Sequence, residues 1–598
     1  MPSLSAKSFQ RAFEKTFATG GRVDAAAIKG LANAATKIKA TDEKQAAQAL
    51  LALVQHDKLL DADEVEPARK ALCQLLGLEP SKLPPALEKL LKNAVPVPNV
   101  EVKNYDLTFD FSKDLSAASP SFPARAVITL DKGAPKVTIL EVDPDRIVVD
   151  EVRAGGKKVA FTCKDGRIHV EGAEGKKTLD ISYRVTPDHD VIDGYGLIRD
   201  RHSGRMWTMT WPYNTGALFP SNSRPHDGAT ARVTVHLKAD AKDAKNNPIE
   251  VVSAGTRRNG SFHVKKDVPA YAVAFTVGAF TDKGHAHDHG HDAVTHGLGT
   301  NATPATRKEV REATTEAMTF FSKWLGAYVF KDRMNIVESQ TNLGGMEHAG
   351  NILLSAGMNR EDSIETAVHE TAHMWFGDTV RIKNWGQFWM SEGFTNFATY
   401  RFMGHKHGDK KMFEMYDRAK DMVRTQIHDK AHALSDKSGT DIHEIFTDIP
   451  YQQGPWMLRM IEGKLGKSAF DDVIGGWFKA KKGTAVTTED FIAFVRDKTG
   501  VDFTAFFSAW NHLEALPTFR DGSSIEGKVA HLLLEPHNTK GRGKPPAGIE
   551  VPVVLEGAGG KRFKALVTPG KAVDVDAGFP IKSISWDPER FVLCDIKL

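Results

Sequence analysis

The sequence predicts a multidomain α+β protein with four parts: a helical extension, a β-rich domain, a mostly helical domain and a small β-rich domain. The chain has 598 residues, which is more than one compact core holds. The hydrophobic period is helical at first, becomes alternating near residue 100, and returns to helical near residue 303. Hydrophobic residues make up 41% and charged residues 26% of the chain, as in soluble globular proteins.

The first two predicted domains differ in their hydrophobic period. Residues 1–98 are predicted to form a helical extension, because they contain alanine- and lysine-rich helical runs that are broken at Gly20-Gly21 and at Pro84-Pro85. Residues 99–283 are predicted to be β-rich. In their first strand Tyr105, Leu107 and Phe109 alternate with polar residues, as expected of a half-buried strand.

The rest of the chain is divided by a histidine-rich segment. Residues 284–302 contain five histidines among glycines and aspartates, and we expect an exposed linker there. Its histidines either bind a metal or are simply solvated. Residues 303–518 are predicted to be mostly helical, and residues 519–598 to form a small β-sandwich.

Composition limits the classes of partner and compartment. A net charge of +3 gives no reason to expect nucleic acid or an anionic membrane as partner. Three distant cysteines cannot form a disulfide framework. The first residues do not resemble a signal peptide, and no apolar stretch is long enough to span a bilayer. We expect a cytoplasmic protein, or a periplasmic or secreted one if a signal has been removed. The sequence leaves the oligomeric state open.

The strongest chemical signal is an H-E-x-x-H motif, His369-Glu370-Thr371-Ala372-His373. Residues four apart share one helix face, so both imidazoles can bind one ion. We expect Asp362 to cap this helix. Glu392 follows His373 by 19 positions, which leaves room for a turn and for a second helix beginning near Ser391. Two His and one Glu are an established ligand set for catalytic zinc.

This arrangement predicts a hydrolase with one zinc ion per chain. Zinc lowers the pKa of bound water to about 7, which makes hydroxide available at neutral pH. Glu370 lies beside the metal ligands, where it can act as general base and later pass the proton to a leaving amine. The oxyanion that forms on the attacked carbonyl needs a further donor.

At these residues the sequence resembles the M1 family of aminopeptidases. The run HETAHMWFGDTVRIKNWGQFWMSEGFTNFATY at 369–400 matches the family pattern of H-E-x-x-H, W-F-G and E-G-F. Tyr451-Gln452-Gln453-Gly454 resembles the family's Y-x-x-G, and Gly344-Gly345-Met346-Glu347-His348 resembles its G-x-M-E-N. The resemblance implies that Tyr451 donates to the oxyanion and that Glu347 binds the substrate amine. Gly344, Gly345 and Met346 would bind the substrate backbone as an added strand.

The same resemblance implies a saddle-like β-rich domain, a thermolysin-like catalytic domain and a C-terminal β-sandwich, with peptides as substrates. The helical extension lies outside it. Three positions depart from the family pattern. His348 replaces the usual Asn, while Met209 and Trp211 stand where the family has the Gln and Glu of T-Q-x-E-P. An indole attracts a cation through its π face, more weakly than a buried carboxylate does.

Several functions agree with these residues. The leading hypothesis is an aminopeptidase that removes N-terminal residues from peptides. Met209 and Trp211 leave room for an endopeptidase, or for a peptidase with a relaxed need for a free amine. Epoxide hydrolysis and a non-catalytic zinc-binding scaffold are lesser alternatives. The M61 glycyl aminopeptidases share the zinc spacing, but W-F-G-D after His373 favours M1.

Overall fold

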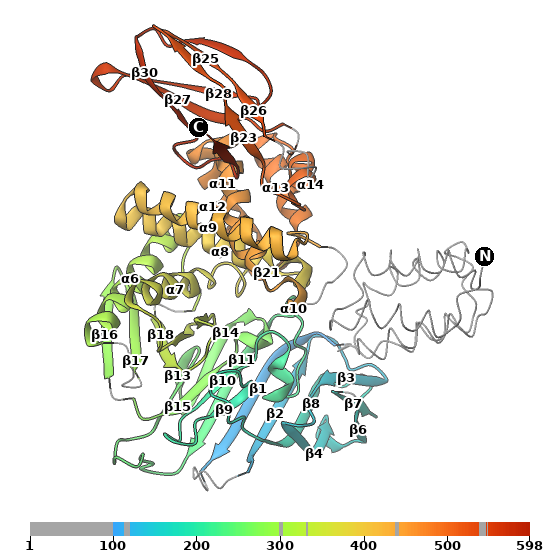
Figure 1. Cartoon of the computed structure of the whole chain (residues 1–598). Coiled ribbons are helices and arrows are strands. Elements are labelled where there is room, and N and C mark those ends of the chain that lie inside the picture. The colour runs from blue at the N-terminus through green and yellow to red at the C-terminus, as the bar shows by residue number, and fades with distance from the viewer. Residues whose placement is uncertain are drawn as a thin grey trace, which may run out of the picture.

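The computed structural model describes residues 100–112, 120–164, 166–280, 282–297, 303–330, 333–436, 442–537, 546 and 548–597. The predicted helical extension at 1–98 lies outside the described residues. Figure 1 shows a helical part between two β-rich parts, the N-terminal one below and the C-terminal one above. The chain is therefore a multidomain α+β protein. Within the described residues no helix is both long and apolar enough to cross a membrane.

The N-terminal β-rich part is built on an eight-stranded sheet with the order β13-β14-β11-β1-β2-β8-β4-β5. Strand β1 is central and alternates buried and solvent-facing residues. It pairs in parallel with β11 and antiparallel with β2, so that Tyr105 lies between Ala231 and Ile128. The strands are β1 (Val102–Phe111), β2 (Phe122–Leu130), β4 (Ile147–Ala154), β5 (Lys157–Lys158), β8 (Thr178–Val185), β11 (Ala229–Leu237), β13 (Thr256–Arg258) and β14 (Ser261–Val268).

Two smaller sheets complete this part, in the orders β12-β15-β10-β9 and β3-β7-β6. The core lies between the large sheet and the four-stranded one, where the rings of Phe109 and Phe275 are 4.7 Å apart. The strands are β3 (Val137–Glu141), β6 (Phe161–Lys164), β7 (Arg167–Glu171), β9 (Gly196–Arg199), β10 (Met206–Met209), β12 (Glu250–Ser253) and β15 (Phe275–Gly278). Short helical turns lie at η2 (Asn214–Ala217) and η3 (Ala270–Ala272).

The expected linker at 284–302 is wrong over the residues that the structure describes. Strands β16 (Asp282–Asp288) and β17 (His291–Gly297) form a hairpin in a five-stranded sheet, β16-β17-β18-β20-β19. His289 and Gly290 both have positive φ, as a two-residue hairpin turn of type I′ requires. The histidines give the segment the composition of a linker, yet β17 is buried from Ala293 to Gly297 and pairs in parallel with β18.

Helices cover this sheet and carry the site. Helix α6 begins after Thr303, whose Oγ1 accepts a hydrogen bond from the Thr306 backbone N–H at 3.1 Å. The elements are α6 (Pro304–Trp324), β18 (Arg333–Ser339), β19 (Gly345–Met346), β20 (Asn351–Ser355), α7 (Arg360–Ala372), β21 (Arg381–Ile382), η4 (Trp385–Gln387), α8 (Trp389–His407), α9 (Asp409–Lys430), α10 (Ile442–Ile445), η5 (Ile449–Gln453), α11 (Gly454–Leu465), α12 (Lys467–Lys481), β22 (Ala485–Val486), α13 (Thr488–Thr499) and α14 (Thr504–Trp510).

The N-terminal and helical parts are joined close to the site. The Arg381 guanidinium donates to three carbonyl oxygens, those of His226 and Asp267 in the β-rich part and that of Gly483 in the helical part, each at 3.1 Å. The backbone N–H of Ala349 donates to the Ala272 carbonyl at 3.0 Å. The Arg381 bonds hold the β-rich part against β21, and the Ala349 bond holds it against the loop that follows β19.

The C-terminal part consists of three three-stranded sheets, β26-β23-β31, β24-β25-β29 and β28-β27-β30. It has its own small apolar core, which includes Leu532, Val553 and Leu555. The guanidinium of Arg459 on α11 lies 4.1 Å from the Phe591 ring centroid and joins this part to the helices. Its strands are β23 (Thr518–Asp521), β24 (Ser524–Glu526), β25 (Val529–Leu532), β26 (Leu534–Pro536), β27 (Val551–Gly557), β28 (Arg562–Val567), β29 (Val573–Asp576), β30 (Ile581–Trp586) and β31 (Asp595–Lys597), with a turn at η6 (Ala558–Gly560).

Candidate active site

Helix α7 positions the two histidines of the H-E-x-x-H motif. Its N-cap is Asn359, whose Oδ1 accepts a hydrogen bond from the Asp362 backbone N–H at 3.0 Å. The expectation that Asp362 is the cap is therefore wrong. The helix begins one turn earlier, and Asp362 lies in its first turn, where an acid complements the helix dipole. At the far end of α7, the Nε2 atoms of His369 and His373 lie 3.0 Å apart.

Glu392 reaches the same point from α8. This helix begins at Trp389, after the turn η4 and close to the predicted start near Ser391, and its first four turns are buried. Helix α8 packs on α7, and Glu392 Oε2 lies 3.2 Å from each of the two Nε2 atoms. The structure thus brings together His369, His373 and Glu392 as a group able to hold a metal ion.

Hydrogen bonds on the opposite side of each imidazole orient its Nε2 toward this point. His369 Nδ1 donates to Asn396 Oδ1 at 2.8 Å, because the Asn396 amide nitrogen is itself donating to the Tyr451 carbonyl at 2.7 Å. His373 Nδ1 donates to the Phe376 carbonyl at 2.9 Å. In the neutral imidazoles both Nε2 atoms therefore carry lone pairs, as metal ligands do.

The donor set fits a divalent cation. Glu392 Oε2 is buried and makes no hydrogen bond within the described part of the chain, although both imidazoles are close to it. Two nitrogen lone pairs and a carboxylate oxygen converge, and their mutual repulsion is relieved when a positive charge lies between them. Burial alone lowers the pKa of His373, but Glu392 and Glu347 outweigh it and raise the pKa well above its usual value. The point therefore attracts positive charge, either a proton or a metal ion, and His₂Glu suits zinc.

Glu370 and Glu347 form a buried acidic pair beside these ligands. Carboxylate oxygens of both residues and a His373 ring nitrogen lie within 4.8 Å of one another. Burial raises the pKa of Glu370 well above its usual value. Burial also raises the pKa of Glu347, to about 7, because the opposing effect of His373 is smaller. A carboxylate in such a position gains strongly from a bound cation.

The short strand β19, Gly345–Met346, forms the edge of the sheet beside the acidic pair. It pairs antiparallel with β20, and Gly344 before it has a φ of +78°. A Cβ at Gly345 would collide with the Glu370 carboxylate. The absence of a side chain there lets the edge strand approach Glu370 closely.

Tyr451 lies in η5, a single π-helical turn over the metal ligands. Its ring is nearly parallel to the His369 imidazole, at 6.2 Å between centroids. Burial raises the pKa of Tyr451 well above its usual value, and Glu392, Glu347 and Glu370 add to this effect. The phenol is therefore neutral and able to donate a hydrogen bond.

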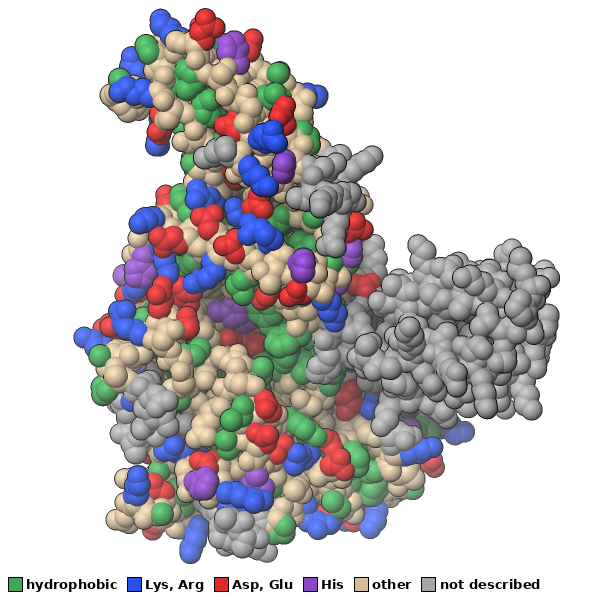
Figure 2. Space-filling view, in the orientation of Figure 1, with side chains coloured by type: hydrophobic (Ala, Val, Ile, Leu, Met, Phe, Trp, Pro, Cys, Tyr) green, Lys and Arg blue, Asp and Glu red, His purple; other side chains and the backbone are tan. Residues whose placement is uncertain are grey.

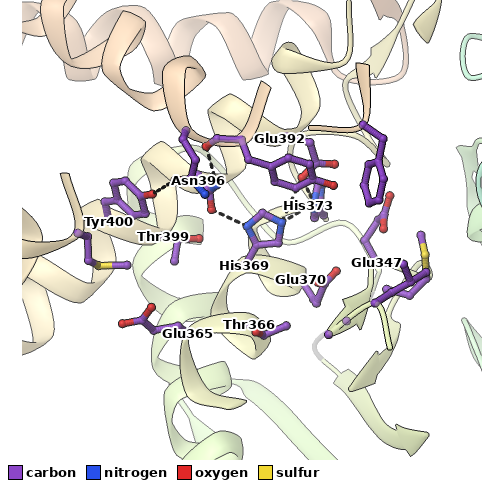
Figure 3. Close-up of a pocket in the computed structure, with 18 of the residues that line it drawn as sticks. Glu347, Glu365, Thr366, His369, Glu370, His373, Glu392, Asn396, Thr399 and Tyr400 are labelled. Atoms are coloured by element: carbon purple, nitrogen blue, oxygen red, sulfur yellow. Dashed lines mark hydrogen bonds and ion pairs between the residues drawn. The ribbon is translucent and has the colours of Figure 1, made fainter. Parts of the chain in front are cut away.

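These residues line a cavity of about 280 Å³ between the N-terminal and helical parts. Figure 2 shows the hollow in this face of the molecule, with histidine and hydrophobic side chains inside it, and Figure 3 shows the side chains around it. All nine predicted site residues line the cavity. The sequence reasoning missed other lining residues: Leu343, Glu365, Thr366, Asn396, Thr399, Tyr400, Met415, Arg418, Phe446 and Gln452.

The three departures from the expected motifs have different surroundings. Trp211 lines the cavity, with its ring 5.0 Å from that of Phe446 and 6.0 Å from that of Phe388. Met209 is buried within β10. His348 is fully buried, and neither ring nitrogen has a hydrogen-bond partner in the described residues. Burial lowers the pKa of His348 to about 3, so this imidazole is neutral.

Comparisons with known proteins agree with this geometry. Tricorn protease-interacting factor F2 of Thermoplasma acidophilum is 22% identical over 520 residues, which cover 82% of this chain and 64% of that protein. Probable aminopeptidase 2 of Sulfurisphaera tokodaii is 23% identical over 73% of this chain and 57% of its own length. This chain thus spans about half to two thirds of the length of these curated relatives.

Solved structures share the fold. A mutant M1 zinc metallopeptidase from Deinococcus radiodurans, bound to a Tyr-Ser-Ala substrate, has a TM-score of 0.57 and 21% identity. The match covers 70% of this chain and 95% of that one. Legionella pneumophila aminopeptidase A in complex with aspartic acid has a TM-score of 0.63 and 17% identity, over 84% of this chain and 60% of that one. Residues 310–510 match the peptidase family M1 domain.

Proposed function

We propose that this protein is a zinc metallopeptidase that removes N-terminal residues from peptides. The observation that carries the proposal is the buried Glu347 carboxylate, which lies within 4.8 Å of Glu370 and His373. A peptide ammonium bound there would neutralise the buried acid and would bring the first peptide bond to the metal ligands. An endopeptidase would have no use for a buried acid at this position.

His369, His373 and Glu392 would hold the metal, and when bound it supplies an activated water at neutral pH and polarises the scissile carbonyl. Glu370 accepts the proton of the attacking water and then passes it to the leaving amine. The raised pKa of this buried carboxyl suits it to holding that proton between the two transfers. Tyr451, kept neutral, donates a hydrogen bond to the developing oxyanion.

The substrate backbone is positioned by β19. Gly345 and Met346 form an edge strand whose outer side can pair with an extended peptide. We also infer that the three parts of the chain correspond to the saddle-like, thermolysin-like and β-sandwich domains expected from the sequence, with the hairpin β16–β17 belonging to the catalytic domain. The substrates are then peptides with a free amino terminus.

The test compares two peptides of the same sequence, one with a free amine and one acetylated. Mass spectrometry of the products, with and without a chelator, identifies which bonds are cut. We expect stepwise loss of residues from the free peptide alone, its abolition by the chelator, and its return with added zinc. Internal cleavage of both peptides would overturn the assignment.

A Glu370→Gln variant separates catalysis from metal binding. The amide keeps the size of the side chain but cannot accept the proton, so this variant should bind zinc normally and lose hydrolysis. Full activity in a zinc-loaded Glu370→Gln protein would contradict the proposed mechanism. Normal zinc binding without hydrolysis by the unaltered protein would instead favour a zinc-binding scaffold.

A further inference from the structure

The cavity continues past the metal ligands, away from Glu347. Its walls there are the facing sides of α7 and α8, which contribute Glu365, Thr366, Thr399 and Tyr400. In Figure 3 Glu365, Thr399 and Tyr400 lie to the left of His369, and Glu347 lies to its right. Glu365 is one turn from His369 on α7, about 6 Å along the axis, and Tyr400 is eight residues from Glu392 on α8, about 12 Å.

Arg418 on α9 closes this end of the cavity. Of the described residues that line the cavity, it is the one lysine or arginine. Its Nη2 donates to Glu365 Oε2 at 2.6 Å, which holds the guanidinium against the cavity wall. The side chain is 50% exposed. A guanidinium has five N–H donors, and within the described residues Glu365 is its hydrogen-bond partner, so donors remain for a ligand.

The charge of Glu365 is already shared with a second cation. Lys411 Nζ lies 2.8 Å from Glu365 Oε1. Lys411 also pairs with Glu361, whose side chain is 64% exposed and is therefore largely screened by solvent. Lys411 by itself already joins α9 to Glu365 on α7. Glu365 therefore has two cationic partners, Lys411 and Arg418, and its single negative charge is shared between them.

A polar surface connects the two ends. The Tyr400 hydroxyl donates to Gln452 Oε1 at 2.8 Å, and this bond fixes the amide. Gln452 Nε2 has no hydrogen-bond partner within the described residues and is available to a substrate carbonyl. The cavity thus runs from an acid at Glu347, past the metal ligands, to a cation at Arg418.

We propose that Arg418 binds the C-terminal carboxylate of short peptides, which makes tripeptides the preferred substrates. This inference rests on the proposed function. An extended chain advances about 3.3–3.6 Å per residue, so two residues beyond the cleaved bond span about 7 Å. A charged hydrogen bond adds about 2.8 Å. The total of about 10 Å is comparable with the axial rise of about 6 Å from His369 to Glu365, which Arg418 contacts, and of about 12 Å from Glu392 to Tyr400. The cavity volume of about 280 Å³ suits a small zwitterion.

The experiment compares Leu-Ala-Ala with Leu-Ala-Ala amide as substrates of the full chain loaded with zinc. Both peptides have the same free amine, so only the terminal carboxylate differs. A hydrogen bond to a charged group of this exposure corresponds to a factor of about ten in kcat/KM, in favour of the acid. We also expect kcat/KM to fall as alanines are added beyond the third residue.

Two variants assign the preference to its residue. In Arg418→Gln the ratio of acid to amide should fall to about one. Lys411→Gln is the matched control, because it also removes a partner of Glu365 but does not line the cavity, and it should keep the preference. Equal rates for acid and amide in the unaltered protein would overturn the inference, as would an unchanged ratio in Arg418→Gln.

Other outcomes separate this inference from the proposed function. If neither peptide loses its first residue, the proposed aminopeptidase activity fails. If both lose it at equal rates, only the role of Arg418 fails. Should Arg418→Gln not fold, as judged by its zinc content and circular dichroism, the acid-to-amide ratio and the length series of the unaltered protein still decide the question.

Discussion

Asn396 is predicted to control both the metal site and the loop above it. Its Oδ1 accepts from His369 Nδ1 at 2.8 Å, and its Nδ2 donates to the Tyr451 carbonyl at 2.7 Å. Replacing it by Ala removes the bond that fixes the His369 tautomer. Loss of such a partner weakens metal binding by about 10–100-fold, or about 1.4–2.7 kcal/mol. We expect a zinc Kd raised by this factor.

Zinc affinity is measured by competition with a chromophoric chelator at a fixed pH. Thr399→Ala is the matched control, since Thr399 lies on the same face of α8 but its hydroxyl donates to the Thr395 carbonyl; its zinc Kd should not change. Asn396→Asp separates the two bonds, because a carboxylate still accepts from His369 but cannot donate to the Tyr451 carbonyl. That variant should keep zinc and lose kcat. An unchanged zinc Kd in Asn396→Ala would refute the reasoning.

Three further predictions concern the base, the donor and the buried histidine. Tyr451→Phe should lower kcat by about 10²–10³-fold and leave KM nearly unchanged. Steady-state kinetics over a series of substrate concentrations checks this. A raised KM with an unchanged kcat would contradict it. Gly345→Ala should lower kcat/KM by at least about tenfold while the zinc content stays normal, because the added Cβ collides with Glu370. Full activity would contradict this prediction and would show that the edge strand β19 can move away from Glu370. The pKa of His348 is about 3 in the folded protein and about 6.5 in the unfolded chain. The unfolded chain therefore binds more protons below pH 6.5, and stability falls as pH falls from 6.5 toward 3, by about 2 kcal/mol at pH 5. Urea titrations at pH 7 and pH 5 measure the loss of unfolding free energy on acidification. This loss should be smaller by about 2 kcal/mol in His348→Asn than in the unaltered protein. An equal loss in both proteins would contradict the lowered pKa of His348.

The spacing of His369, His373 and Glu392 along the chain was enough to predict them as a group of metal ligands. The four-residue spacing of His369 and His373 places both on one helix face, and the length of chain before Glu392 permits a return. The same rule points to Asn396, one turn after Glu392, as a residue facing the ligands. It was missed because the sequence does not show which face of the second helix meets the first.

Other features depend on contacts between segments far apart in the chain. Trp211 and Arg418 line one cavity although about two hundred positions separate them, and no local pattern shows this. The polar composition of residues 284–302 predicts a linker, whereas the structure of the hairpin at 282–297 is set by the pairing of β17 with β18. The cap of α7 was misplaced by one turn, because Asn359 and Asp362 are both good capping residues.

The replacement of an acid by Trp211 agrees with the charge balance of the cleft. Glu347, Glu370 and Glu392 are buried together, and each of the other two acids lies close enough to Glu370 to raise its pKa. A further carboxylate at position 211 would add negative charge to the cavity that Glu347 and Glu370 line, and nearby negative charge favours the protonated form of a carboxyl group. An indole adds no such repulsion and still presents a π face to a cation. We therefore expect one buried carboxylate in a weakly screening environment to suffice for the substrate amine. Trp211 and Phe446, whose ring centroids lie 5.0 Å apart, give the same cavity an apolar wall.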